Sequence, residues 1–183
     1  MKKILTLAIS LCAATWAFAQ YNHVQLAPNG NKIEEGQYNA DPGIQPGDSK
    51  ETIAAKMATI YKIGTWKYWY ENGQLSSEQY YDNSGNPTGT WKTWFTNGVL
   101  ESSITRATGA AVYYHPNGEK AEEGQININM QRVGTWQGWH ENGNLNYTGT
   151  FNSIGQKNGT WQFFDTNGTV YQTQHYVNDV LQN

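Results

Sequence analysis

The chain has 183 residues and a formal net charge of −3, from 12 Lys and Arg against 15 Asp and Glu. A mildly acidic chain without a basic run lacks the electrostatic footprint of proteins that bind nucleic acid or anionic lipid. Aromatic residues make up 14% of the chain, which is too many for a disordered protein. Its richness in Gly, Thr, Trp and Tyr is typical of a β-sheet with many turns.

The N-terminus predicts a secretory signal peptide over residues 1–19. Lys2 and Lys3 precede an apolar run that ends in Ala17-Phe18-Ala19, an A-x-A cleavage site, so we expect the mature chain to begin at Gln20 and to be periplasmic or extracellular. The run is too short to be a membrane span. The single cysteine, Cys12, lies inside it, so the mature chain is predicted to have no disulfide, cysteine nucleophile or thiolate metal site.

Residues 20–183 are predicted to form one repeat domain whose first unit is degenerate. The stretch "PNGNKIEEGQYN" at residues 28–39 resembles "PNGEKAEEGQIN" at residues 116–127 more than it resembles the other units. We interpret this as the duplication of a larger block that contains three units. Self-similarity at a fixed period indicates that each unit buries its apolar surface against its neighbours.

An insertion at residues 40–63 separates the first unit from the second. Asp48 followed by Glu51 has the spacing of a helix capping box, and Ile53, Met57 and Ile60 fall on one helical face. We expect a short helix that ends near Thr59 and then a strand, although residues 57–63 can also be interpreted as strand throughout. Insertions of this length often have a function, so this segment is a second candidate functional element.

Four complete units follow the pattern G-T-W-x-x-W-x-x-N-G-x-L, and they begin at Gly64, Gly89, Gly134 and Gly159. Asn-Gly between runs of aromatic and β-branched residues predicts a β-hairpin with a two-residue type I′ turn. That turn would pair Tyr70 with Leu75 and place Leu75 on the same side as Trp66. The structural residues of the repeat are Trp66, Trp69, Trp91, Trp94, Trp136, Trp139, Trp161, Gly73, Gly98, Gly118, Gly143 and Gly168.

The two tryptophans of a unit are three residues apart, so an undistorted strand points them to opposite sides. Both sides of the sheet would then carry aromatic side chains, which suits a sheet that has no second layer behind it. The predicted fold is therefore all-β, with about six tandem antiparallel hairpins in an elongated, twisted, single-layer sheet and one short helix in the insertion.

The repeated "GTWxxWxxNGxLxxxxxY" resembles the MORN repeat variant, a form found in bacterial proteins often described as antitoxin components of toxin–antitoxin systems. The resemblance covers residues 21–183 except for the insertion. It implies tandem antiparallel hairpins and a general role as a scaffold or a partner-binding surface. Some members of the family are said to bind lipid.

The candidate binding face consists of aromatic and variable positions, namely Tyr68, Tyr70, Phe95, His140 and Phe163. The alternative is that the aromatic residues form the core of a thin sheet. The paired glutamates Glu34-Glu35 and Glu122-Glu123 point to opposite sides of a strand, which disfavours the paired carboxylates of a glycosidase. The four histidines have no metal-ligand spacing, and no catalytic or cofactor-binding motif occurs.

These features predict a protein that is not an enzyme and that needs no metal or cofactor. The first hypothesis is an exported scaffold that binds a protein partner in the cell envelope or outside the cell. The alternative is a carbohydrate-binding module that uses Trp and Tyr as stacking platforms. An antitoxin or immunity-type protein is a further, less favoured hypothesis.

Overall fold

The structure is a computed structural model that describes residues 20–182, so the predicted signal peptide lies outside the described residues. The chain forms two compact units that divide between Gly89 and Thr90. Over the described residues, unit 1 is 20–89 and unit 2 is 90–182.

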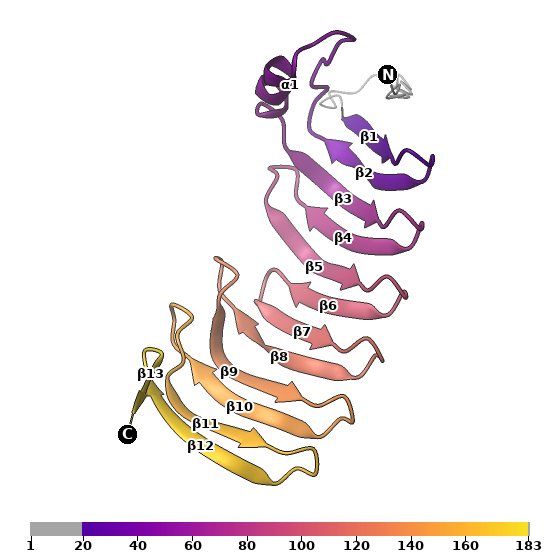
Figure 1. The fold of residues 1–183 in the computed structure, drawn as a ribbon. Coiled ribbons are helices and arrows are strands. Elements are labelled where there is room, and N and C mark those ends of the chain that lie inside the picture. The colour runs from indigo at the N-terminus through magenta and orange to yellow at the C-terminus, as the bar shows by residue number, and fades with distance from the viewer. Residues whose placement is uncertain (1–19, 183) are drawn as a thin grey trace. The chain divides into compact units, whose positions relative to one another are not determined.

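Unit 1 consists of two β-hairpins with the insertion between them (Figure 1). The first hairpin pairs β1 (Tyr21–Leu26) with β2 (Lys32–Tyr38), and the second pairs β3 (Lys62–Trp69) with β4 (Leu75–Tyr81). Strand β2 also pairs with β3. The helix α1 (Lys50–Met57) lies between β2 and β3 in the chain, which confirms the predicted short helix followed by a strand. The helix ends two residues before the predicted Thr59, so Ile60 lies outside it.

Strand β5 (Pro87–Trp94) begins in unit 1 and continues into unit 2. The other strands of unit 2 are β6 (Leu100–Thr105), β7 (Ala110–Tyr114), β8 (Lys120–Ile126), β9 (Arg132–Trp139), β10 (Leu145–Phe151), β11 (Gly159–Phe164), β12 (Val170–Val177) and β13 (Val180–Gln182). Over residues 20–182 the thirteen strands follow chain order in one unclosed antiparallel sheet. The predicted fold class of tandem antiparallel hairpins is confirmed.

The Asn-Gly turns are hairpin turns, but they are not of the predicted type. The backbone N–H of Gly73 donates to the Tyr70 carbonyl, and the N–H of Tyr70 donates to the Gln74 carbonyl. Gly73 has a φ of 86°, whereas Asn72 is not among the residues with positive φ. A three-residue loop of this kind is a type I turn that ends in a bulge at a left-handed glycine, so the prediction of a type I′ turn was wrong.

The longer turn shifts the register of the hairpin. Trp69 pairs with Leu75 and Tyr68 pairs with Ser77, with a bulge between these pairs. Leu75 is therefore a partner of Trp69, and its predicted place beside Trp66 was wrong. The same shift recurs in the other Asn-Gly hairpins, where Trp94 pairs with Leu100 and Trp139 with Leu145.

One side of each unit is closed by the first tryptophan of the repeat. Trp66 in unit 1 and Trp136 in unit 2 are fully buried, and Trp161 in unit 2 is 3% exposed. We call this side of each unit the closed face. Trp69 and Trp139, three residues later, lie on the other side and are half-buried; we call it the open face. A single layer thus obtains its core by covering one face with large indoles.

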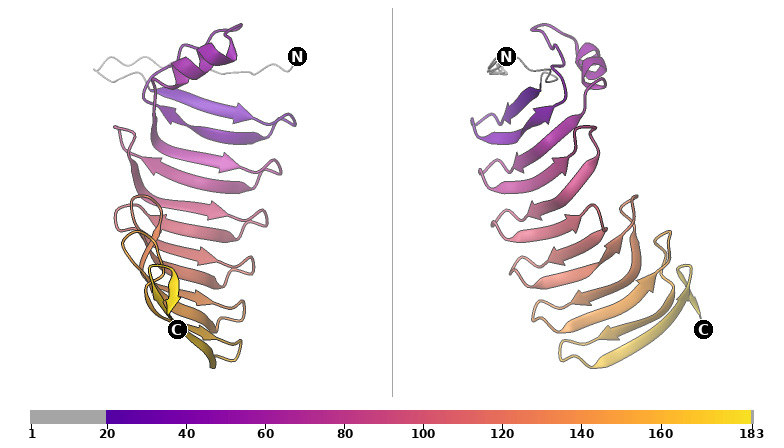
Figure 2. Two further views of the ribbon diagram at one scale, coloured as in Figure 1. Left: turned by 60° about the vertical axis from the view of Figure 1, so that its left-hand side comes forward. Right: turned by 180° about the vertical axis from the view of Figure 1, so that it is seen from behind.

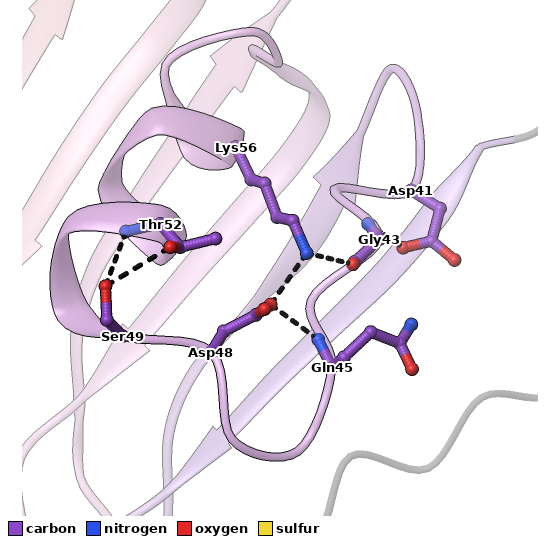
Figure 3. Close-up of polar contacts among 7 residues, drawn as sticks. All are labelled: Asp41, Gly43, Gln45, Asp48, Ser49, Thr52 and Lys56. Atoms are coloured by element: carbon purple, nitrogen blue, oxygen red, sulfur yellow. Dashed lines mark hydrogen bonds and ion pairs between the residues drawn. The ribbon is translucent and has the colours of Figure 1, made fainter.

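The insertion is organised by a lysine of the helix. Lys56 donates to the Asp48 carboxylate and to the Gly43 carbonyl, both at 2.7 Å, and Asp48 also accepts from the backbone N–H of Gln45 (Figure 3). The helix is capped by Ser49, whose hydroxyl accepts from the N–H of Thr52. The predicted cap at Asp48 was therefore one residue too early, and no residue of the helix is buried.

Candidate interaction surfaces

The five residues of the predicted binding face occupy two kinds of position. Tyr68 and Phe163 lie on the closed faces of their units, where their rings stack on Trp66 and Trp161 at centroid distances of 6.4 and 6.3 Å. Tyr70, Phe95 and His140 each begin an Asn-Gly turn. The predicted binding face therefore draws on both closed-face positions and turn positions.

The histidines that begin turns bond to the next hairpin. Nε2 of His115 lies 2.8 Å from the Trp139 carbonyl, and Nε2 of His140 lies 2.9 Å from the Phe164 carbonyl. These contacts tie neighbouring hairpins together. Within residues 20–182 no group of three or more His, Cys, Asp or Glu side chains could hold a metal ion.

The asparagines of the Asn-Gly turns also link successive hairpins. The side chain of Asn117 accepts from the backbone N–H of Glu119 and donates to the Glu141 carbonyl at 3.0 Å. Asn142 likewise accepts from Asn144 and donates to the Thr166 carbonyl at 2.8 Å. The repeat therefore needs asparagine for its side-chain amide, which satisfies its own turn and bonds the next one.

Each buried indole lies on a glycine of the preceding strand. A Cβ at Gly36 would come within 3.0 Å of three ring carbons of Trp66, and the same holds for Gly124 beneath Trp136. The indole Nε1 of each tryptophan donates to a backbone carbonyl of the same preceding strand, at 3.0 Å: Trp66 donates to Gln37 and Trp136 to Gln125. These glycines were not predicted, although "EEGQ" occurs in both degenerate units.

A cation covers the other side of each buried indole. Lys62 lies 4.2 Å from the Trp66 ring, Arg132 lies 4.4 Å from Trp136, and Lys157 lies 4.5 Å from Trp161. In all three cases the basic residue precedes the tryptophan by four positions. This spacing was a usable signal in the sequence, and the contact shields the indole by a cation–π interaction.

Ionisable groups on the closed faces are paired within the repeat. In unit 1, Glu34 lies 3.7 Å from His23 and 3.5 Å from Lys62, and the hydrogen bond from His23, followed by the charge of Lys62, holds the Glu34 pKa below its usual value. In unit 2, Glu122 pairs with Arg132 and accepts from the Tyr147 hydroxyl at 2.9 Å. Burial and this bond raise the pKa of Tyr147. The lowered pKa keeps the Glu34 carboxylate ionised and weakly basic, and the raised pKa keeps the Tyr147 hydroxyl protonated. A general base or a nucleophile needs a shift in the opposite direction.

The two clusters reach the same arrangement from different residues. The cross-strand pair is Tyr68 with Ser77 in unit 1, and Gly138 with Tyr147 in unit 2. Tyr147 covers Gly138, where an added Cβ would lie within 3.0 Å of three ring carbons. The large and small members of the pair have exchanged strands, and in both units a tyrosine hydroxyl bonds within the cluster, to Lys62 in unit 1 and to Glu122 in unit 2.

The open face carries a shallow hollow at the same place in both units. In unit 1 it measures about 700 Å³ and is bordered by Glu35, Gln37 and Trp69 among others. In unit 2 it measures about 340 Å³, and Glu123 and Gln125 take the places of Glu35 and Gln37. Both hollows lie where the strand register shifts by two residues, between Glu35 and Gln37 and between Glu123 and Gln125.

In unit 2 the hairpin tips opposite the Asn-Gly turns are apolar and exposed. They belong to the β8–β9, β10–β11 and β12–β13 turns, which lie along one side of the unit (Figure 2). Ile128 is 88% exposed, Ile154 60% and Val180 63%. We call Ile128, Met130, Ile154, Val177 and Val180 the apolar edge. Monomeric proteins seldom expose side chains of this size side by side.

Hydrogen bonds hold these three turns together. The Asn127 side chain donates to the Ser153 carbonyl at 3.2 Å, and the Asn152 side chain donates to Oδ1 of Asn178 at 3.0 Å. The apolar side chains are therefore presented from a bonded row of turns. By contrast, the Asn-Gly tips of unit 2 carry Thr96, Pro116, Glu141 and Thr166.

The repeat pattern of the chain corresponds to a known family model. The MORN repeat variant model matches residues 62–83, 87–106, 132–153 and 157–178. The chain belongs to the MORN repeat variant family. The matched segments are the four complete units, and each contains a β-hairpin of the structure. MORN repeats are interaction modules of a non-catalytic repeat family. No curated protein matches the chain, and no helix within residues 20–182 is long and apolar enough to cross a membrane.

Proposed function

We propose that the chain is an exported, non-enzymatic scaffold that binds a protein partner through the apolar edge of unit 2. The observation that carries the proposal is the exposure of Ile128, Ile154 and Val180 on three bonded turns. Apolar side chains that protrude from a rigid frame can be buried by a partner without ordering the frame first, which lowers the entropic cost of association.

Backbone strain at the same place supports an interaction role. Met130 has a φ of 62°, whereas Gly155 holds the corresponding position of the next turn with a φ of 86°. A non-glycine residue in the left-handed region costs about 1 kcal/mol. The methionine thus places an apolar side chain at the tip where glycine would be the less strained residue.

The charge near the edge indicates what the partner offers. Nη1 of Arg106 lies 2.7 Å from the Met130 sulfur, and Lys157 precedes β11. Within the described part of the chain neither side chain forms an ion pair. Asp179 in the β12–β13 turn offsets one of these cations, so we expect a partner surface that is mainly apolar. Two cations on a chain of net charge −3 are too few for strong attraction to anionic lipid.

The test is affinity capture from envelope extract of the organism that makes the chain. The wild type is compared with the double variant Ile128→Ser plus Ile154→Ser and with a matched control, Thr96→Ala plus Thr166→Ala, at the opposite tips. The wild type and the control should capture the same protein, which is then purified, and its affinity for the double variant should fall at least tenfold, about 1.4 kcal/mol.

The same three proteins are sedimented with phosphatidylserine vesicles. Edge-dependent binding to vesicles, or capture that the double variant leaves unchanged, would contradict the proposal. Export is tested separately by the mass of the protein recovered from the periplasm and the medium, which should correspond to a chain that begins at Gln20.

A further inference from the structure

The open face of unit 1 carries a hollow that borders the Trp69 indole. It is formed by β1 to β4 and measures about 700 Å³. Its lining combines the Trp69 indole with the side chains of Asn22, Glu35, Gln37, Lys67 and Glu78. The hollow lies in unit 1 and shares no residue with the apolar edge of unit 2.

The charges that border this hollow cancel. Lys32 pairs with Glu35 and also lies 5.2 Å from the Trp69 ring centroid. Lys67 pairs with Glu78 at 3.5 Å across β3 and β4. Two ammonium groups thus face two carboxylates, and the site has no net charge to attract an anion or a cation.

The amides of the hollow are held in place. Nε2 of Gln37 donates to Oδ1 of Asn22 at 2.9 Å, across the β1–β2 pair. The other amide groups of Asn22 and Gln37 are carried by two paired strands. Beside them, the Tyr80 hydroxyl donates to Glu78 at 2.6 Å. Such a fixed array of donors and acceptors beside an aromatic ring gives orientation and specificity to a polar ligand.

Unit 2 provides the internal comparison. Its hollow has Ala110 where unit 1 has Asn22, and Gln137 where unit 1 has Lys67. It has no aromatic lining and about half the volume, about 340 Å³. The two hollows thus share one backbone arrangement. Of the two, the hollow of unit 1 is the one whose lining combines an indole, amides and paired charges.

We propose that the hollow of unit 1 binds a neutral oligosaccharide. A sugar ring presents an apolar face that packs against aromatic groups and a rim of hydroxyls that both donate and accept hydrogen bonds. The lining of the hollow extends over β1 to β4, which suits a chain of several sugars. Its balanced charge disfavours acidic polysaccharides and phosphorylated ligands.

The test is isothermal titration of the full mature chain with four neutral hexasaccharides, namely cellohexaose, xylohexaose, maltohexaose and chitohexaose, and with the acidic hexagalacturonate. At least one neutral hexasaccharide should bind, and hexagalacturonate should bind at least tenfold more weakly. Gln37→Ala and Lys67→Met should each raise the Kd of that neutral sugar at least fivefold.

The matched control is Gln125→Ala in unit 2, which should leave the Kd unchanged. Thermal melting of each variant identifies any loss of folding, and Asn22→Ala, at an exposed position, serves as the second unit 1 variant in that event. Failure of all four neutral sugars to bind overturns the proposal. Equal losses for Gln37→Ala and Gln125→Ala, or preferred binding of hexagalacturonate, also overturn it.

Discussion

Tyr147 packs on Gly138 in unit 2, whereas the equivalent pair in unit 1 has its tyrosine on the other strand. This difference allows a direct test of why position 138 is a glycine. Replacement of Gly138 by Ala would place a Cβ within 3.0 Å of three carbons of the Tyr147 ring, whereas ordinary Cβ contacts begin at 3.4 Å. The ring cannot move freely, because its hydroxyl bonds to Glu122 at 2.9 Å and to Arg132 at 3.3 Å.

The cost of this substitution can be assigned to two sources. Insertion of a methyl group into a packed site costs about 1–3 kcal/mol, and displacement of the Tyr147 hydroxyl from a carboxylate costs about 1–2 kcal/mol. We expect Gly138→Ala to lower the free energy of unfolding by about 2–5 kcal/mol, the sum of the two contributions. In a Tyr147→Ser background the ring is gone, and the same substitution should cost less than about 1 kcal/mol.

The assay is urea unfolding followed by tryptophan fluorescence for the four members of this double-mutant cycle. A fifth protein, Gly138→Tyr with Tyr147→Ser, reproduces the Tyr68 and Ser77 pair of unit 1 and should recover most of the stability lost by Tyr147→Ser alone. An equal cost of Gly138→Ala in both backgrounds would refute the ring contact as the reason for glycine at this position.

Three other predictions follow from the turns and the closed faces. Asn117→Ala removes the bond to the Glu141 carbonyl and should lower the free energy of unfolding by about 1–2 kcal/mol in urea titration, with Asn117→Asp intermediate because it keeps the turn acceptor. Met130→Gly relieves a φ of 62° and should raise the free energy of unfolding by about 1 kcal/mol while it weakens partner binding; a loss of stability would contradict the strain. Burial raises the pKa of Tyr38 from 10.0 to about 12; because the folded pKa is the higher one, the stabilisation is present below pH 10 and is lost between pH 10 and 12. The melting temperature should fall over that interval, and fall less in Tyr38→Phe.

The sequence was sufficient to predict the hairpins but not the type of turn. Both a type I′ turn and a type I turn with a bulge place glycine at a left-handed φ, so Gly73 fits either. The choice depends on the asparagine before the glycine, and at Asn117 and Asn142 the side-chain amide of this asparagine also bonds to a neighbouring hairpin. A sequence pattern that is analysed one hairpin at a time cannot predict a hydrogen bond between two hairpins.

The opposite orientations of the two tryptophans could be predicted from strand alternation, but which of them is buried could not. Burial of Trp136 depends on Gly124 of the preceding strand and on Arg132 above the ring. These residues surround the indole only once β8 and β9 pair with a two-residue shift in register. Strand alternation alone was enough to predict that Glu122 and Glu123 point to opposite sides of the strand. Their separate ion-pair partners agree with this, because Glu122 pairs with Arg132 and Glu123 with Lys120.

The apolar edge was missed because the sequence analysis followed the Asn-Gly turns. Ile128 and Ile154 lie in the turns between repeats, where a single exposed isoleucine is unremarkable in a sequence. Their significance arises from the antiparallel order of the strands, which brings every second turn to the same side of the sheet. The hollow of unit 1 could likewise not be predicted from the sequence, because the long insertion separates Gln37 from Lys67 in the chain.

The most direct measurement is site-specific photo-crosslinking in the cells that make the protein. A photoreactive amino acid replaces Ile128 in one variant and Thr166, at the opposite tips of the same unit, in another. We expect Ile128 to yield a crosslink to one defined protein and Thr166 to yield none, and we expect Ile154→Ser to reduce the yield from Ile128. Equal crosslinks from both positions, or crosslinks to lipid from Ile128, would contradict it.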